Sequence, residues 1–365
     1  MTIITWLSEL LLYVSFSLLA GYSILTFVPA RFKPEMRIPN KVIILAAVSI
    51  PILAFMPILR IVLFFAGDIG FGLTIKNVLF SFEEGKAYFK LVITAIVLIW
   101  FLIRRPLINP RHSSILTGLL TIIMALILSS ASHLASLIGW QGVTWHFLHF
   151  VAAISWAGTL LVTGCFSLKP DHWQNYLKWM TPLGIICLIG ISVSGLFMLQ
   201  PVAPDYVDSW VLSYGQALLL KHIAVIPLIL FAFMNGVLYR YKQKRNTAWN
   251  PLSWIRMEGV AILVVFLFTG YMGQQSPPHD VSLTVRESGS SSWFQFLVTD
   301  KLPEQVKLII ALNGLSVMLG VLAIFTLALL VYKAWKSEGW KWPQGLGLIF
   351  IAFAYLSLMT AVTFQ

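Results

Sequence analysis

Two histidines three residues apart form the most suggestive pair of chemical groups in this chain of 365 residues. His146 and His149 would share one face of a helix, because residues at positions i and i+3 are neighbours on a helix surface. This spacing suits two ligands of one metal ion, or one ligand and a neighbour that orients it. The alternative is an interfacial pair, for which the adjacent Trp145 would also be typical.

Two more histidines are candidates because of their apolar surroundings. His222 follows Lys221 inside the apolar run 216–227. Ionisable residues within a membrane are costly and usually functional. The alternative is a core histidine bonded to a backbone carbonyl, with Lys221 reaching outward along its apolar stem. His133 stands alone, and is either functional or a hydrogen-bonded histidine of the bundle.

Methionines add sulfur to this set. Met198 and Met272 are predicted at the same membrane level as the histidines. Thioether and imidazole ligands together suit copper, since sulfur favours Cu(I) and imidazole accepts Cu(I) or Cu(II). Packing in an apolar bundle is the alternative for each methionine. The two cysteines, Cys165 and Cys187, fall toward the opposite side, so a thiolate site is not expected.

The elements that must position these groups are membrane helices. The chain is 58% hydrophobic and 11% charged, whereas soluble domains carry about 25% charged residues. A span needs roughly 20 mostly apolar residues. We therefore predict an all-α, polytopic transmembrane bundle of about ten spans, at Trp6–Val28, Val42–Phe65, Tyr88–Ile103, Ile115–Ile138, Trp145–Leu168, Met180–Leu199, Val211–Tyr239, Ile255–Met272, Val306–Tyr332 and Gly345–Phe364. The stretch Gly67–Gly85 is predicted as a loop or a re-entrant piece.

The basic residues predict the orientation. One set of alternate connections holds 17 of the 25 Lys and Arg residues and four acids, and the other set holds six basic residues and ten acids. By the positive-inside rule the first set faces the cytoplasm, so both termini are predicted to be extracytoplasmic. The net charge of +11 is then an orientation signal, and no nucleic-acid partner is expected. The first span lacks a basic leader and is predicted to be retained. Five histidines, the four above and His279, fall on the outer side.

Four pieces of sequence, in order along residues 145–278, resemble one known family. The fifth span reads His149-Phe-Val-Ala-Ala-Ile-Ser-Trp156-Ala-Gly158, and the sixth carries Ser192-Val-Ser-Gly195-Leu. The seventh reads Tyr214-Gly215-Gln-Ala-Leu-Leu-Leu-Lys221-His222, followed by Met234-Asn235-Gly-Val-Leu-Tyr-Arg240. The eighth carries Glu258 and ends in the stretch 270–278. Together these pieces resemble the copper resistance D (CopD) family of bacterial membrane proteins.

The motif residues also have a physical reading of their own. Trp156-x-Gly158 and Gly195 would permit close helix approach, as small residues do in membrane bundles. Tyr214-Gly215 would begin the seventh helix, from which Lys221 and His222 project. Glu258 would sit near the N-terminus of the eighth helix, where the helix dipole favours a carboxylate, or would pair with an arginine.

The resemblance implies copper handling at the bacterial cytoplasmic membrane, commonly import, rather than catalysis. The predicted metal site uses His149 and His222, with His146, His133, Met198 and Met272 as supporting or relay ligands. No outer segment is long enough for a CopC-like copper carrier, so delivery by a separate extracytoplasmic carrier is expected. We predict three regions: 1–140 with four spans, 141–280 as the CopD-like core of four spans, and 281–365 with an outer loop and two spans.

Two other functions fit the same histidines. Imidazoles on separate helices can ligate haem b, as His149 with His222 or His133 with His222, which would make the protein an oxidoreductase linked to a quinone or to Cu(II). A scaffold that delivers copper to an oxidase during assembly is the third reading. A hydrolase is disfavoured, because no zinc motif or nucleophile–histidine–acid arrangement occurs at membrane depth.

Overall fold

Helices make up most of this computed structural model. It describes residues 2–104, 109–245, 251–298, 303, 305–336 and 341–365. Ten helices in this part of the chain are long and apolar enough to cross a membrane, which confirms the predicted all-α membrane fold. The chain divides into two compact units, Met1–Pro201 (unit 1) and Val202–Gln365 (unit 2). The predicted three-region division stays a prediction.

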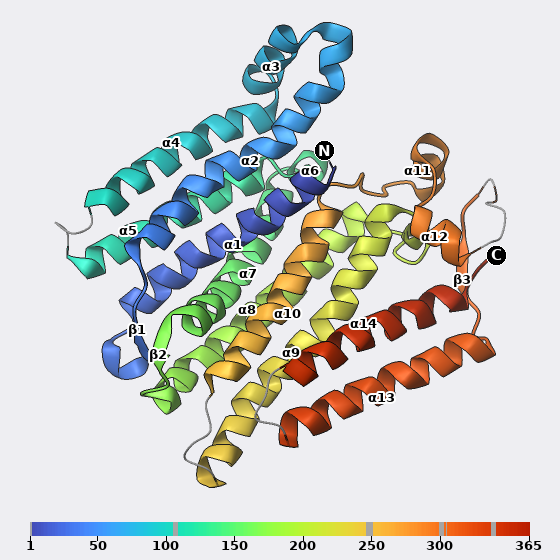
Figure 1. The fold of residues 1–365 in the computed structure, drawn as a ribbon. Helices are drawn as coiled ribbons and strands as arrows, with labels where there is room; N and C mark the ends of the chain where they lie inside the picture. Colours follow the sequence, from blue (N-terminus) through green and yellow to red (C-terminus); the bar gives the residue numbers. More distant parts are fainter. Residues whose placement is uncertain (1, 105–108, 246–250, 299–302, 304, 337–340) are drawn as a thin grey trace. The chain divides into compact units, whose positions relative to one another are not determined.

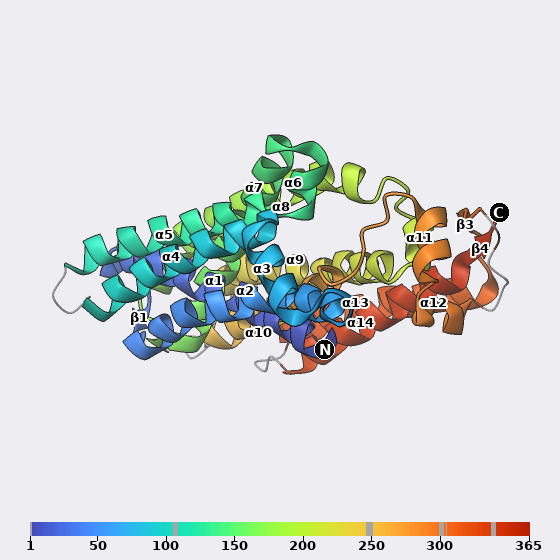
Figure 2. The same cartoon turned by 90° about the horizontal axis from the view of Figure 1, so that it is seen from above.

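Unit 1 is a bundle built around its first helix (Figure 1). Helix α1 packs against α2, α5 and α7, and α4 packs against α2 and α5. The helices are α1 (Thr2–Phe27), α2 (Asn40–Ile69), α3 (Phe71–Phe80), α4 (Glu83–Arg104), α5 (Pro110–Ser130), α6 (His133–Ile138), α7 (Trp140–Phe166) and α8 (Trp173–Val202). The side-by-side arrangement of α4 and α5 is also visible from above in Figure 2.

The contact between α1 and α7 depends on two glycines. A Cβ atom on Gly158 would lie 2.0 Å from the Ser17 carbonyl oxygen, and one on Gly21 would lie 2.1 Å from the Gly158 carbonyl oxygen. No real side chain tolerates such distances, so the two backbones touch directly. The predicted role of Gly158 in close helix approach is confirmed.

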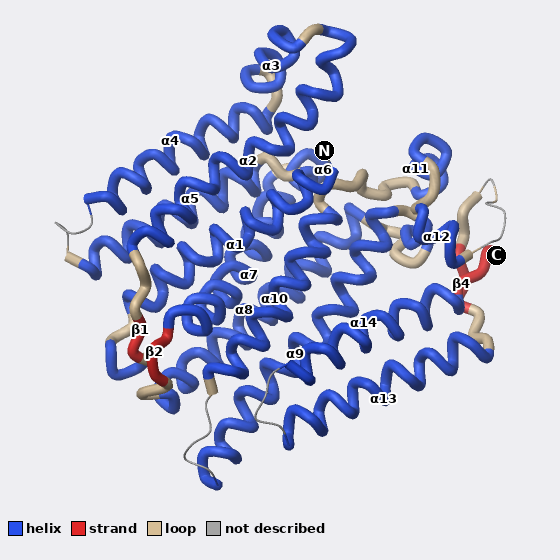
Figure 3. The backbone as a smooth tube through the Cα atoms, viewed as in Figure 1, coloured by secondary structure: helices blue, strands red, loops and turns tan. Residues whose placement is uncertain are grey.

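A short strand pair ties two connections of unit 1 together (Figure 3). Strand β1 (Glu35–Met36) follows the 3₁₀ turn η1 (Ala30–Phe32), and pairs antiparallel with β2 (Ser167–Lys169) directly after α7. The pairing joins the α1–α2 connection to the end of α7.

The predicted fourth span, Ile115–Ile138, is wrong at its outer end. Helix α5 ends at Ser130, and the separate short helix α6 follows. Serine hydroxyls compete with the helix for backbone partners here. Ser130 donates to the Ile127 carbonyl, and Ser132 accepts from the Ala135 amide to cap α6. Helix α7 then starts at Trp140, five residues before the predicted Trp145, after a turn at Gly139 with φ +60°.

Other element boundaries differ from the sequence prediction as well. The stretch predicted as a loop or re-entrant piece is helical: α2 runs to Ile69, and α3 follows Gly70, whose φ of +88° suits glycine. The predicted ninth span, Val306–Tyr332, begins too early, because Leu308–Ile310 forms a strand before the helix starts at Gly314.

Unit 2 contains the remaining four long helices. Helices α13 and α14 run antiparallel and pack along their length, and α9 packs against α10 and α14. The elements are η3 (Asp208–Val211), α9 (Ser213–Arg245), α10 (Leu252–Met272), α11 (Val281–Ser288), α12 (Ser292–Leu297), β3 (Leu308–Ile310), α13 (Gly314–Lys336), α14 (Lys341–Ala361) and β4 (Val362–Phe364). Strands β3 and β4 pair antiparallel, and the Asp208 carboxylate accepts from the Leu308 amide, which fixes this end of the unit.

Candidate metal centre

The α7 histidine nearest to α8 is held by two acceptors on that helix. The Nδ1 atom of His149 lies 3.1 Å from the Ile191 carbonyl oxygen and 3.1 Å from the Ser194 hydroxyl. The imidazole also lies against Gly195, where a Cβ atom would be 3.5 Å from its Cε1 atom. His149 is half-buried. The small residues of α8 therefore accommodate the His149 ring.

Hydrogen bonding fixes the tautomer of His149. A carbonyl oxygen can only accept, and the Ser194 hydroxyl donates its own proton to the Gly190 carbonyl at 2.5 Å. The proton of His149 therefore sits on Nδ1, which leaves the lone pair on Nε2. This arrangement, with one ring nitrogen bonded to a protein acceptor and the other carrying the lone pair, is typical of metal-ligating histidines.

His146 bonds toward α5. Its Nδ1 atom lies 3.0 Å from the Ser129 hydroxyl, which itself lies 2.9 Å from the Ala125 carbonyl oxygen. Ser129 is fully buried, and its one proton goes either to that carbonyl or to the imidazole, so both tautomers of His146 can make this bond. The two imidazoles of α7 are oriented by different neighbouring helices.

Met198 lies near the end of α8 that contacts His149. It is half-buried and stands four residues after Ser194, so both project from one face of α8. The rings of Trp145 and Phe197 stack with centroids 4.2 Å apart, which joins α7 and α8 at this level. Within unit 1, His149 therefore contacts the face of α8 that carries Ser194 and Met198, whereas His146 bonds to α5.

His222 lies in unit 2 with a partner that the sequence analysis missed. Its Nδ1 atom is 2.9 Å from the Tyr206 hydroxyl. The Tyr206 ring meets Trp210 edge-on, with centroids 5.8 Å apart. His222 is exposed and Lys221 is half-buried. Tyr206 lies in the connection before α9, sixteen residues away and outside any helical period, so no sequence pattern linked it to His222.

Burial raises the pKa of Tyr206 to about 12. The phenol is neutral below that pH, so its O–H can donate to His222 and its oxygen can accept from His222. Either tautomer of His222 makes this bond, whereas the Ile191 carbonyl selects one tautomer of His149. Tyr206 is a positioning residue for the His222 ring.

The other predicted ligands lie at helix ends. Met272 is the last residue of α10 and is half-buried. His133 is the first residue of α6 and exposed, not part of a long span as predicted. His279 is exposed as well. In the part of the chain that the structure describes, no three His, Cys, Asp or Glu side chains gather as a group able to hold a metal ion.

The motif residues of unit 2 lie at both ends of α9, Asn235 with Glu258 at one end and Tyr214-Gly215 at the other. Glu258 lies in the second turn of α10 and is 3% exposed, and Asn235 of α9 donates to its carboxylate at 3.2 Å. The Arg240 side chain, part of the same motif, lies outside the described residues. Tyr214 is buried. A Cβ atom on Gly215 would lie 1.9 Å from the Ser209 carbonyl oxygen, so this glycine allows η3 to fold against α9.

Comparison with known proteins identifies one family. Residues 175–272 match the family model of Copper resistance protein D (CopD). The match runs from the third residue of α8 to the last residue of α10, and does not include α7. No curated protein and no solved structure matches the chain. The chain is therefore a membrane protein, with ten membrane-capable helices among its described residues, and its residues 175–272 are similar to the Copper resistance protein D (CopD) family, as the sequence motifs predict.

Proposed function

We propose that this protein binds copper on its outer side through the Nε2 atoms of His149 and His146 and the Met198 thioether, and imports the ion. The observation that carries the proposal is the way in which the two imidazoles are held. Each bonds through Nδ1 to a group on a neighbouring helix, so Nε2 is the ring nitrogen that we propose as the ligand. Imidazole and thioether ligands accept copper in both common oxidation states.

His222 and Met272 are the proposed ligands from unit 2. Tyr206 orients the His222 ring, which is the usual role of a hydrogen-bonded neighbour of a ligand. That His149 and His222 bind the same ion is a prediction from the sequence. His133 is the weakest member of the set, because it is exposed at the start of a six-residue helix.

A copper site with few ligands favours transport of the ion over its tight retention. Copper would exchange from an extracytoplasmic carrier of the CopC type onto imidazole and thioether groups, one ligand replacing another. Conduction requires binding that is favourable enough for the ion to arrive and weak enough for it to leave. Two imidazoles and one thioether meet that requirement better than a closed site with four strong ligands.

The first prediction is the loss of bound copper in histidine variants. We expect purified protein to bind copper, and His149→Ala combined with His222→Ala to reduce the content to the background of metal-free protein. His112→Ala is the matched control, because His112 is exposed on the predicted cytoplasmic side. Elemental analysis of the three proteins checks this. Equal copper content in all of them would refute the proposal.

The single variants separate a shared site from two sites. If His149 and His222 bind one ion, each single substitution lowers copper content as much as the double substitution. If each unit has its own site, the losses add.

The visible spectrum of the same samples tests the haem alternative, because a Soret band in the wild-type protein that disappears in the variants would identify haem ligation instead.

A further inference from the structure

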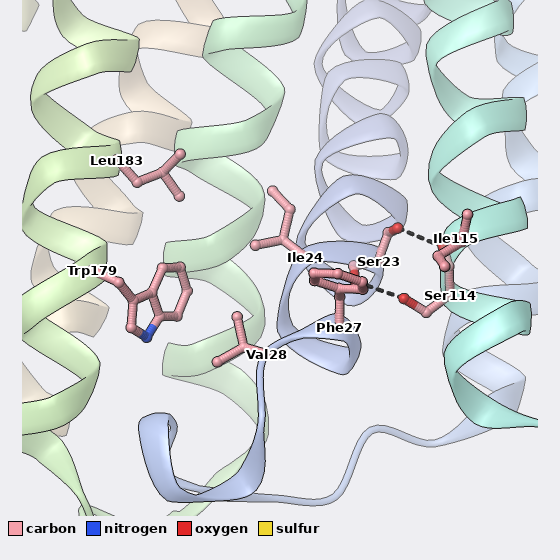
Figure 4. Close-up of a pocket in the computed structure, with 8 residues that line it drawn as sticks. All are labelled: Ser23, Ile24, Phe27, Val28, Ser114, Ile115, Trp179 and Leu183. Carbon is pink, nitrogen blue, oxygen red and sulfur yellow. Dashed lines mark hydrogen bonds between the residues drawn. The ribbon is translucent and has the colours of Figure 1, made fainter.

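A cavity in unit 1 lies far along the helices from the histidines of α7. It has a volume of about 320 Å³ and lies between the end of α1, the start of α5 and the first half of α8. This is within the range of roughly 300–1,000 Å³ typical of ligand pockets. The lining residues, seen in Figure 4, are Ser23, Ile24, Phe27, Val28, Ser114, Ile115, Trp179 and Leu183.

The polar atoms in the cavity wall are already satisfied. The Ser23 hydroxyl donates to the Ser114 carbonyl at 2.6 Å, and the Ser114 hydroxyl donates to the Ser23 carbonyl at 2.9 Å (Figure 4). The Trp179 indole donates to the Phe32 carbonyl at 2.7 Å. The wall therefore offers aliphatic and aromatic surface to an occupant, and suits a hydrocarbon chain better than a polar solute.

Basic residues lie on the segments that form one end of this cavity. The Arg111 guanidinium carbon lies 5.2 Å from the centroid of the Phe27 ring, which is itself part of the wall. Arg31 is exposed in η1, and its carbonyl accepts from Asn175 of α8 at 3.1 Å. Lys178, next to the lining residue Trp179, is exposed and donates to the Asn175 side chain.

These cations lack carboxylate partners. Among the described residues, Arg31, Arg111 and Lys178 form no ion pair with an Asp or Glu side chain. All three belong to the basic connections that the positive-inside rule assigns to the cytoplasmic side. Anionic lipids of that leaflet attract such basic residues, and basic pockets between transmembrane helices on this side bind their headgroups.

We propose that this cavity is a binding site for an anionic phospholipid of the cytoplasmic leaflet. One acyl chain occupies the space between Ile24, Phe27 and Leu183, and the phosphate lies beside Arg111, with Arg31 and Lys178 at the rim. The lining residues Phe27 and Ile115 are each 51% exposed, so the cavity is open to the surrounding lipid. The site is independent of the proposed copper ligands.

Quenching of Trp179 tests the proposal in the full-length protein. The protein is placed in bilayers in which either phosphatidylglycerol or phosphatidylcholine, at equal amounts, carries brominated acyl chains. The contribution of Trp179 is the difference between the wild-type protein and Trp179→Phe, since the chain has 14 tryptophans. We expect brominated phosphatidylglycerol to quench this contribution more strongly than brominated phosphatidylcholine.

Two arginine variants separate a headgroup site from general attraction to lipid. Arg111→Gln is expected to reduce the preference for phosphatidylglycerol about fivefold, the effect of one basic residue near a membrane surface. Arg104→Gln is the matched control. Arg104 also lies beside an aromatic ring, 5.8 Å from the Trp100 centroid, and also belongs to the predicted cytoplasmic set, but it does not border the cavity. Its substitution should leave the preference unchanged.

The wild-type protein provides a second measurement should Arg111→Gln fold poorly. High salt weakens attraction between charges at a surface, so the preference for phosphatidylglycerol should decrease as ionic strength rises. Equal quenching by both lipids at low salt would overturn the proposal. So would an equal effect of Arg104→Gln and Arg111→Gln.

Discussion

His146 and His149 bond through Nδ1 to groups on neighbouring helices, and for His149 the Ile191 carbonyl decides which nitrogen carries the lone pair. Sequence spacing placed the two residues on one helix face, but it could not supply the bonding partners, which come from α5 and α8. His222 is held differently, by the Tyr206 hydroxyl, which can donate or accept. At the scale of residues, the ligand chemistry of a histidine depends on a neighbour that is distant in sequence.

The ionisation of Tyr206 is a prediction at this scale. Burial raises its pKa from 10 to about 12, so the neutral phenol is the form favoured by folding. A group whose pKa is raised contributes stability that is fully present below its unfolded pKa, near 10, and is lost as pH rises from 10 toward 12. The near-ultraviolet tyrosinate absorbance, taken as wild type minus Tyr206→Phe, should have its midpoint near pH 12. A midpoint near pH 10 would contradict the buried position.

Glycines and serines determine how the helices of unit 1 pack and where they end. Gly21 and Gly158 let α1 and α7 touch through their backbones, and a Trp-x-Gly motif could be read from sequence as such a contact. The break between α5 and α6 was not readable in the same way. Residues 131–138 are mostly apolar, so the sequence alone predicts that the span continues through them. In the structure the serine hydroxyls bond to nearby carbonyls, and the helix ends at Ser130.

The α1–α7 contact gives a prediction for stability. Gly158→Ala places a methyl group 2.0 Å from the Ser17 carbonyl oxygen, so the helices must separate, at a cost of about 1–3 kcal/mol of unfolding free energy. Gly67→Ala is the control, because nothing lies within 4 Å of its added Cβ and alanine is the better helix former. Thermal unfolding in detergent should show a lower midpoint for Gly158→Ala only. Equal midpoints for both variants would exclude the tight contact.

The whole molecule is a membrane protein with a strong asymmetry of charge. Composition and hydropathy were sufficient to predict the ten spans, because a bilayer requires long apolar helices whatever their neighbours are. The distribution of Lys and Arg further predicts that both termini are extracytoplasmic. The same distribution supplies the cations around the α1–α5–α8 cavity, so orientation and lipid binding would use the same residues.

Labelling in intact cells tests this orientation. In a Cys165→Ser, Cys187→Ser background, we expect a membrane-impermeant maleimide to label Ser288→Cys and not Lys169→Cys. Both positions are exposed, at the end of α11 and in β2 respectively, so accessibility differs only through the side of the membrane. After cell disruption both should react. The reverse labelling pattern would invert the topology and place the histidines of α7 on the cytoplasmic side.

The sequence by itself determined the number and approximate bounds of the membrane spans and the resemblance of one region to the CopD family, and it supplied the histidines and methionines that we propose as copper ligands. These follow from local composition and from the spacing of a few side chains, which act over short stretches of chain. Tertiary structure alone decided the tautomer of His149, the partner of His146, the pairing of Tyr206 with His222, and the cavity between α1, α5 and α8. Each of these depends on atoms brought together from separate helices, and helix packing is set by the fit of side chains across whole interfaces.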